Sequence, residues 1–216
     1  RLRRATHGAH AATELTSRAA ENLFWAASYL QRSESLLRAA NAYQSRYDTW
    51  LDYGLEQDRR ALAQWLAVLQ GYLPELPHAV PAPDTLRRTM LANQVGSLAW
   101  NLHRAIECVY TVRDFWSLDS WRIIEELEEL LTYAERNVEV VGLDQLVHRL
   151  LTPMLAFWAA SQEGLALMQG GLWLQLGRRL ERVQNMVTAI AAVCRQLGDG
   201  EETLALETLL LSHGCM

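Results

Sequence analysis

The sequence contains no lysine: all 20 basic residues among its 216 residues are arginines. This absence excludes the chemistries that need a side-chain amine, namely a Schiff-base lysine, the lysine of a Walker-A phosphate loop and the lysine of a kinase-type site. Each cation is instead a planar guanidinium, which stays charged and can donate two parallel hydrogen bonds to a carboxylate or a phosphate. Arginine-rich codon usage in a GC-rich genome is the simplest origin of the bias.

Cysteine and long apolar runs are scarce too. The three cysteines, Cys108, Cys194 and Cys215, are odd in number, widely spaced and without a CxxC pair. They predict neither a disulfide framework nor a zinc site, so we expect no metal, no cofactor and a reducing, cytoplasmic compartment. The sequence has no run of about 18 apolar residues, so no membrane span is expected. The net charge of -5 argues against binding to nucleic acid.

Glycine and proline interrupt the sequence rarely, at 12 and 5 positions, and four of the prolines lie in a predicted loop at 73–83. Sustained alternation of polar and apolar residues is missing, so strands are not expected. The apolar spacing predicts an all-α, antiparallel bundle of six or seven helices, with Gly96 as a weak point and Pro153 as a kink. The predicted helices cover about 17–47 (or to 53), 57–72, 85–116, 120–137, 143–168, 172–197 and 201–211.

The length favours a single domain. Residues 1–14 are basic and begin with arginine instead of methionine, so we interpret them as a linker or a cloning remnant. Residues 15–216 then form one helical domain, and we expect the chain to be a piece of a longer protein.

The late helix carries apolar residues at alternating spacings of three and four, which is the pattern of a narrow coiled-coil seam. The seam is predicted to face the core, and Cys194 is therefore interpreted as a small buried hydrophobic residue instead of a nucleophile. Its members are Trp173, Leu176, Leu180, Val183, Val187, Ile190 and Cys194.

Two arginines, Arg32 and Arg182, occur in the same local setting. Four, seven and eleven residues after each arginine, on the same helix face, the residues are apolar or aromatic. This similarity predicts an internal pseudo-repeat of the first and late long helices. A covered arginine needs carboxylate or carbonyl partners, because an unpaired buried guanidinium costs several kcal/mol. The candidate partners are Glu21, Glu34, Glu107, Asp114 and Glu181.

Two interpretations of these arginines stay open. They form either structural ion-pair networks that fix the register of the helices, or a binding centre for an anion or a carboxylate between the two related helices. Along the first helix, Arg18, Glu21, Trp25 and Ser28 lead to Arg32 as one charged and aromatic stripe.

The same residues resemble a known family. The segments 15–25 (LTSRAAENLFW) and 29–34 (YLQRSE) are similar to the start of the bacterial alpha-E domain, an all-helical family of unknown function named for its Glu-Arg motif. The segment 173–182 (WLQLGRRLER) resembles its second Glu-Arg segment. Glu107, Arg113, Asp114 and Trp121 fit its middle helices more loosely. Gln31 departs from the glutamate that the family usually places there.

The resemblance implies a context more than an activity. Alpha-E domains occur beside, or fused to, circularly permuted ATP-grasp ligases and transglutaminase-like proteins, in systems proposed to synthesise or modify peptides. We therefore expect a non-catalytic module that binds a partner ligase, or its anionic or peptidic substrate, through two arginine motifs. The alternative is an enzyme that acts on an activated acyl or phosphoryl intermediate with arginine–glutamate pairs. A peptide or carboxylate ligand and a homo-oligomer are also left open.

The candidate network, for binding or for structural ion pairing, is defined by these motifs and by the middle helices. Its residues are Arg18, Glu21, Trp25, Arg32, Glu34, Glu107, Arg113, Asp114, Arg178, Glu181 and Arg182. Two other patterns are weaker indications of a functional site. The pair His103 and Glu107 is interpreted as a hydrogen-bonded histidine. The acidic run 125–129 is interpreted as a solvated face or a docking surface.

Overall fold

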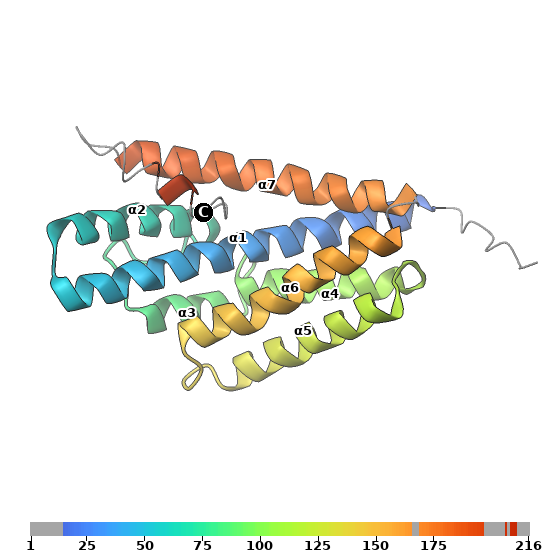
Figure 1. The fold of residues 1–216 in the computed structure, drawn as a ribbon, viewed down its shortest axis with the longest axis horizontal. Coiled ribbons are helices and arrows are strands. Elements are labelled where there is room, and N and C mark those ends of the chain that lie inside the picture. Colours follow the sequence, from blue (N-terminus) through green and yellow to red (C-terminus); the bar gives the residue numbers. More distant parts are fainter. Residues whose placement is uncertain (1–14, 166–168, 197–205, 207, 211–216) are drawn as a thin grey trace, which may run out of the picture.

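The computed structural model describes residues 15–165, 169–196, 206 and 208–210, and within them every regular element is a helix (Figure 1). The all-α bundle predicted from the sequence is confirmed. The elements are α1 (Ser17–Tyr53), α2 (Glu56–Tyr72), α3 (Pro83–Leu91), α4 (Leu98–Thr111), the 3₁₀ helix η1 (Arg113–Phe115), α5 (Leu118–Arg136), α6 (Leu143–Leu165) and α7 (Gln169–Gln196).

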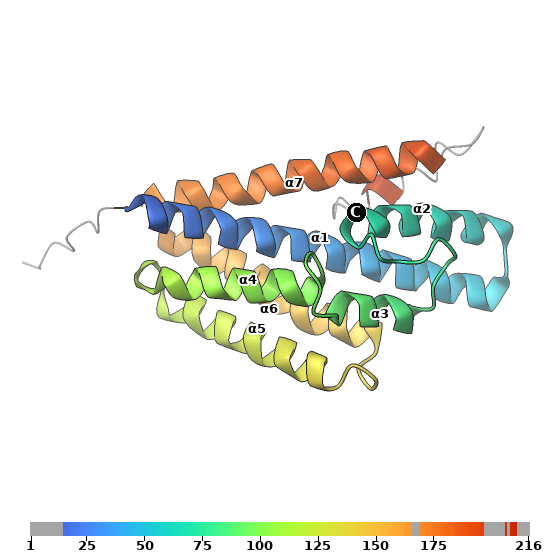
Figure 2. The same cartoon turned by 180° about the vertical axis from the view of Figure 1, so that it is seen from behind.

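Helix α1 is the axis of the bundle. It spans 37 residues, about 55 Å at ~1.5 Å per residue. The Thr16 side chain accepts a hydrogen bond from the Ala19 N–H at its start, and the Gly54 N–H donates to the Trp50 carbonyl at its end. In both views α1 lies between α7 on one side and α4, α5 and α6 on the other (Figures 1 and 2). Most of its residues up to Tyr43 are therefore buried.

The helix predicted over 85–116 is three elements in the structure. It breaks after Leu91, and the chain turns at Gly96, whose φ of 89° is open to glycine but strained for other residues. The Ser97 hydroxyl accepts a hydrogen bond from the Trp100 N–H and starts α4, while η1 ends the segment. Gly96 is thus a helix boundary instead of a weak point inside one helix.

Other boundaries differ by a few residues. Ser117, not Asp119 or Ser120, caps α5, and α7 begins at Gln169, so the two glycines at 170–171 lie inside its first turn. The proline-rich loop is confirmed, and Pro153 lies within α6. The predictions for 1–14 and for most of 201–211 fall outside the described residues. No helix in the described ranges is both long and apolar enough to cross a membrane.

Helices α1 and α7 run parallel, because the intervening helices return the chain to the end where α1 begins (Figure 1). Contacts between them join residues about 150 positions apart, for example Ser28 with Gly177 and Ser35 with Asn185. The two segments compared in the pseudo-repeat therefore lie side by side in the same register. Whether they are structurally equivalent remains a prediction.

The predicted orientation of α7 is wrong. The seven seam residues face outward: Val183 and Val187 are 59% and 60% exposed, and Cys194 is exposed too. The side that packs against the bundle carries mostly small and polar residues, with Leu174 and Val193 as its larger apolar members; the small and polar ones are Gly170, Gly177, Glu181, Asn185, Ala189 and Ala192. Small residues on this side let the two backbones approach, and α1 supplies partners for the polar ones.

We expect Gly177→Ala to weaken the packing of α7. A Cβ at this position would lie 2.2 Å from the backbone oxygen of Phe24, which cannot move without bending α1. The free energy of unfolding should fall by about 2–3 kcal/mol, as for other overpacked contacts, in urea titrations followed by circular dichroism.

Gly71→Ala is the matched control, since its Cβ would meet only the end of the Thr188 side chain, at 2.6 Å. That side chain must rotate and give up the hydrogen bond from its hydroxyl to the Gln184 carbonyl, but alanine favours the helix by up to about 1 kcal/mol, so less stability should be lost than at Gly177. Equal losses in the two variants would contradict a specific backbone contact at Gly177.

Candidate functional site

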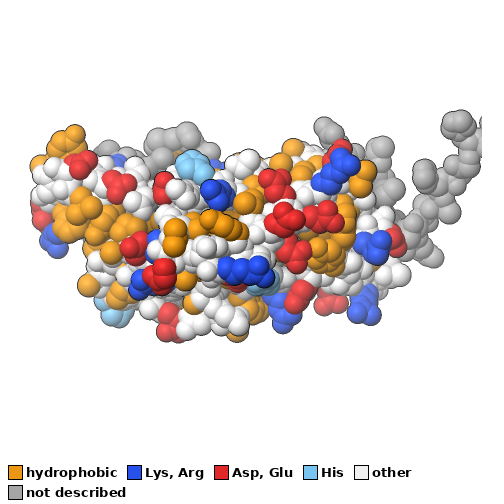
Figure 3. Space-filling view, turned by 90° about the horizontal axis from the view of Figure 1, so that it is seen from below, with side chains coloured by type: hydrophobic (Ala, Val, Ile, Leu, Met, Phe, Trp, Pro, Cys, Tyr) orange, Lys and Arg blue, Asp and Glu red, His pale blue; other side chains and the backbone are white. Residues whose placement is uncertain are grey.

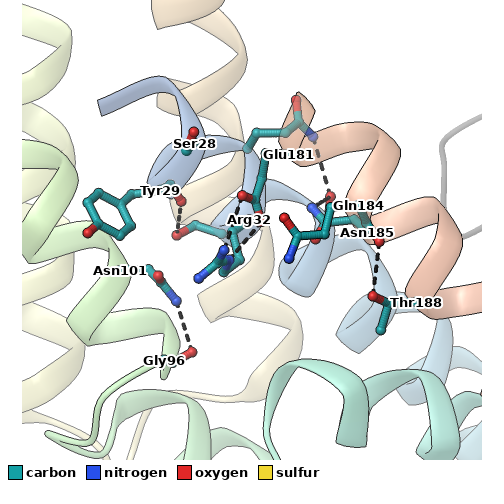
Figure 4. Close-up of polar contacts among 12 residues, drawn as sticks. Ser28, Tyr29, Arg32, Gly96, Asn101, Glu181, Gln184, Asn185 and Thr188 are labelled. Atoms are coloured by element: carbon teal, nitrogen blue, oxygen red, sulfur yellow. Dashed lines mark hydrogen bonds and ion pairs between the residues drawn. The ribbon is translucent and has the colours of Figure 1, made fainter. Parts of the chain in front are cut away.

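Arg32 and Glu181 form a two-point ion pair between α1 and α7. The Arg32 Nε donates to Glu181 Oε1 at 2.7 Å, and its Nη2 donates to Oε2 at 3.1 Å. Figure 4 shows the two side chains pointing toward each other across the gap between the helices. Glu181 is only 5% exposed, whereas Arg32 is 31% exposed. The carboxylate is therefore buried with a hydrogen bond to each oxygen, whereas part of the arginine side chain reaches solvent.

A second cluster lies on the neighbouring face and is centred on Arg178. Its Nε donates to Gln31 Oε1 at 3.1 Å, its Nη2 lies 3.7 Å from Glu34 Oε2, and its guanidinium stacks 4.1 Å above the ring of Trp158. Burial lowers the pKa of Arg178, against the opposing effect of Glu34. Arg178 therefore contacts two acceptors on α1, Gln31 and Glu34, and one aromatic ring on α6, Trp158.

Glu34 is buried and serves three neighbours at once. Besides the approach of Arg178, its Oε1 accepts from Arg38 Nε at 3.1 Å and its Oε2 accepts from the Trp158 indole at 2.9 Å. Two arginines and an indole thus stabilise one buried carboxylate. Gln31 accepts from Arg178 without adding a second negative charge, so glutamine at this position keeps the hydrogen bond and lowers the charge.

Ser35 joins the two helices through neutral groups. Its hydroxyl accepts from Gln31 Nε2 at 3.3 Å and from Asn185 Nδ2 at 3.1 Å. Burial raises the pKa of the nearby Tyr72 to about 12, although a hydrogen bond with Ser35 opposes the shift. We name the whole set the α1–α7 clasp: Gln31, Arg32, Glu34, Ser35, Arg38, Trp158, Arg178, Glu181 and Asn185.

Four members of the clasp were not predicted from the sequence, namely Ser35, Arg38, Trp158 and Asn185. Trp158 lies on α6, 124 residues from the Glu34 that it contacts. Nothing in the sequence distinguishes it from the other tryptophans, which are expected to be packing residues. Ser35 and Asn185 are short polar residues inside helices, where they are usually exposed. Their role depends on the close approach of α1 and α7.

An aromatic surface forms where α1 faces α4, next to the side of α1 that carries Arg32. Trp25 stacks on Tyr29 with ring centroids 5.7 Å apart, and Tyr29 meets Trp100 edge-on at 5.6 Å. Arg104 lies 5.6 Å from the centroid of Trp100 and donates to Glu107 at 2.7 Å. Trp25 is 42% exposed, and Arg104 and Glu107 are exposed as well. We call these five residues the α1–α4 aromatic surface.

The remaining predicted residues are spread over the surface. Arg18 and Asp114 line a hollow of about 350 Å³ where α1 begins beside η1. Glu21, Arg113 and Arg182 are exposed. The structure therefore brings together Arg32, Glu34, Arg178 and Glu181 in the clasp, and Trp25 and Glu107 in the aromatic surface.

Helix α5 supplies the partner of His103 and carries the acidic run 125–129. His103 pairs with Glu135 at 3.0 Å instead of with Glu107. Glu125, Glu128 and Glu129 line an open hollow of about 810 Å³ along α5, and acidic side chains gather on this side of the molecule (Figure 3). Among the described residues, no group of three or more His, Cys, Asp or Glu is placed to hold a metal ion.

We expect the Arg32–Glu181 pair to couple strongly in a double-mutant cycle. Arg32→Met leaves a buried carboxylate without its main partner, so the free energy of unfolding should fall by about 2–3 kcal/mol. Arg32→Met combined with Glu181→Met should cost clearly less than the sum of the single changes, with a coupling of at least about 1 kcal/mol. Urea unfolding measures all four proteins.

Glu56 and Arg59 provide the matched control cycle. They also form a two-point contact, at 2.9 and 2.7 Å, but both are exposed. We expect no measurable coupling there. A coupling between Arg32 and Glu181 no larger than that of the control would show that the clasp does not stabilise the fold.

Comparison with known proteins agrees with this arrangement. A family model described as "a predicted alpha-helical domain with a conserved ER motif" matches residues 15–216. No match was found among curated proteins or among solved structures. The resemblance inferred from the two Glu-Arg segments is therefore confirmed, and the chain belongs to the Alpha-E family.

Proposed function

We propose that this domain is a non-catalytic binding module that docks a partner protein on the α1–α4 aromatic surface, within an ATP-grasp-linked system for peptide synthesis or modification. The partner is the circularly permuted ATP-grasp ligase, fused or separate, or the peptide that it handles. The Glu-Arg motif has a structural role in this proposal: it holds α1 against α7.

The state of the clasp carboxylates supports a non-catalytic role. A general base or nucleophile must reach its substrate, but Glu34 and Glu181 are both buried and both paired with arginine. Their oxygens are occupied by Arg32, Arg38 and the Trp158 indole. The arrangement favours the structural interpretation of these residues over catalysis on an activated intermediate.

The observation that carries the proposal is the ladder of the exposed Trp25 and the half-buried Tyr29 and Trp100, with the exposed Arg104 beside it. Tryptophan, tyrosine and arginine are the residues that most often dominate binding energy at protein interfaces. The rings are preorganised by stacking on one another, so little conformational entropy is lost when a partner covers them. Burial raises the pKa of Tyr29, whose hydroxyl stays neutral and available as a hydrogen-bond donor.

The charges around the ladder favour an acidic or peptidic ligand. Arg104 is exposed on one side of the rings, and the exposed edge of Arg32 lies close enough to influence Tyr29 electrostatically. Arg32 already donates to Glu181 and Arg104 to Glu107, so a ligand carboxylate would bind the donors that these pairs leave or replace Glu107 at Arg104. A peptide with an aromatic or apolar side chain next to an acidic one fits this combination.

Trp25→Ala should weaken binding of the purified ATP-grasp ligase by about 30-fold or more, the effect of losing an interface hot spot of ~2 kcal/mol. Arg104→Ala should weaken it further when the two are combined. Isothermal titration measures the affinities, and circular dichroism checks that the helices remain, since Trp25 is partly exposed.

Tyr53→Ala is the matched control, because Tyr53 is an exposed aromatic residue at the far end of α1. It should bind the ligase as the unchanged protein does. If neither Trp25→Ala nor Arg104→Ala alters the affinity, or if the ligase does not bind at all, the proposed docking surface is wrong.

A further inference from the structure

The outer face of α7 is an apolar stripe that no described part of the chain covers. Its residues are exposed by between 38% and 69%, and no acidic side chain interrupts it. Figures 1 and 2 show α7 along one edge of the bundle, with its outer side open in both views. The stripe consists of Leu172, Trp173, Leu176, Leu180, Val183, Met186, Val187 and Ile190.

We propose that this stripe binds the same stripe of a second copy of the chain, with the two α7 helices antiparallel. The proposal is independent of the partner surface on α1 and α4. It rests on the extent of the stripe, its period, its self-complementarity and the placement of charge beside it.

The extent of the stripe matches what a stable dimer needs. The exposed fractions correspond to roughly 700–800 Å² of apolar surface, close to the ~800 Å² that each partner contributes to a standard interface. The largest apolar patch on a monomeric protein is usually about 300–600 Å². A surface of this size, left open to water along one helix, is typical of an interface.

The period of the stripe specifies a long helix as the occupant. Spacings of three and four repeat from Trp173 to Ile190, a stretch of about 26 Å at ~1.5 Å per residue. This period of 3.5 residues keeps one face in contact with a partner helix over its whole length. A flat or irregular surface would not need such regularity.

In an antiparallel pair, larger side chains of one copy pack against smaller side chains of the other. In the register that places Leu180 opposite Val183, Leu176 also meets Val187, and Trp173 meets Ile190. Each layer then combines a larger side chain with a smaller one, and the two-fold axis makes every contact occur twice. A parallel pair would place tryptophan on tryptophan and valine on valine, which leaves the seam uneven.

The charges beside the stripe fit the same register. Arg179 lies within the stripe, seven residues before Met186, and Arg182 lies beside it, while the acidic Glu181 faces α1. In the antiparallel pair Arg179 lies beside Met186 of the second copy. The two Arg179 residues are then about 7.5 Å apart along the axis at ~1.5 Å per residue, close to the screening length of about 8 Å at physiological salt.

Sedimentation equilibrium of the full chain tests the proposal. We expect the mass of two chains at low micromolar concentration. Val183→Glu places a carboxylate in the central layer beside its symmetry mate and should raise the dimer dissociation constant at least 100-fold. Val140→Glu is the matched control, because Val140 is also exposed but lies between α5 and α6, and it should leave the dimer intact.

Circular dichroism should show folded helices in both variants, since both positions are exposed. A chain that stays monomeric at about 100 μM would overturn the proposal, as would a Val183→Glu protein that remains dimeric. So would a monomer whose stripe is covered only by a helix of another protein.

Disulfide cross-linking tests the direction of the helices. In a background with Cys108→Ser, Cys194→Ser and Cys215→Ser, the combination Leu176→Cys with Val187→Cys should give covalent dimers on oxidation, seen in non-reducing gels. Leu176→Cys alone and Val187→Cys alone are the controls and should stay uncross-linked. Cross-linking of the single variants instead would show a parallel pair and overturn the antiparallel arrangement.

Discussion

The close contact of α1 and α7 at Gly177 is the constraint on which the rest of the structure depends. The position of a Cβ there would lie 2.2 Å from the Phe24 carbonyl oxygen, so the two backbones touch in a way that other residues prevent. At this separation Arg32 reaches Glu181 with two hydrogen bonds, and Ser35 reaches Asn185. Arg32 of the first motif segment and Glu181 of the second thus meet at a helix–helix distance that a glycine permits.

The same contact determines which face of α7 points outward. If α7 turned its apolar stripe toward α1, the buried Gln31, Glu34 and Ser35 would face leucine and valine and lose their partners. Leaving a buried carboxylate unpaired costs several kcal/mol, and bulky side chains could not approach Phe24 as Gly177 does. The polar groups of α1 therefore select the polar face of α7, and the apolar face is left to solvent or to another molecule.

Local chemistry in the sequence was enough to predict most helices and the residues of the two motifs. The proline-rich loop, the start of α1 near Thr16 and the choice of Arg32, with Glu181 among its candidate partners, follow from residue type and spacing, whereas Arg182, selected together with Arg32, is exposed. The orientation of α7 does not, because amphipathicity assigns the apolar face to the core when no partner is considered. The overlooked cue was a face on which Gly177 and Ala189 alternate with Glu181 and Asn185.

Long-range contacts were beyond prediction for a different reason. Trp158 completes the environment of both Glu34 and Arg178, but it enters from α6, and nothing near it in the sequence differs from an ordinary packing tryptophan. The break between α3 and α4 could have been recognised, since Gly96 followed by Ser97 is a turn residue followed by a helix cap. The apolar spacing continues across Gly96 and Ser97, and for this reason one helix was predicted over 85–116.

The two proposed surfaces are compatible in space. Helix α7 and helix α4 lie on different sides of α1 in both views (Figures 1 and 2). A dimer formed through α7 would leave both aromatic surfaces open, so it would present two copies of the partner site. Two linked sites bind a dimeric or repetitive partner more tightly than one site does, without any new contact, when the geometry permits both to engage. Dimerisation through α7 would then strengthen docking at α1 and α4, while the clasp holds the two helices that carry these surfaces in one rigid relation.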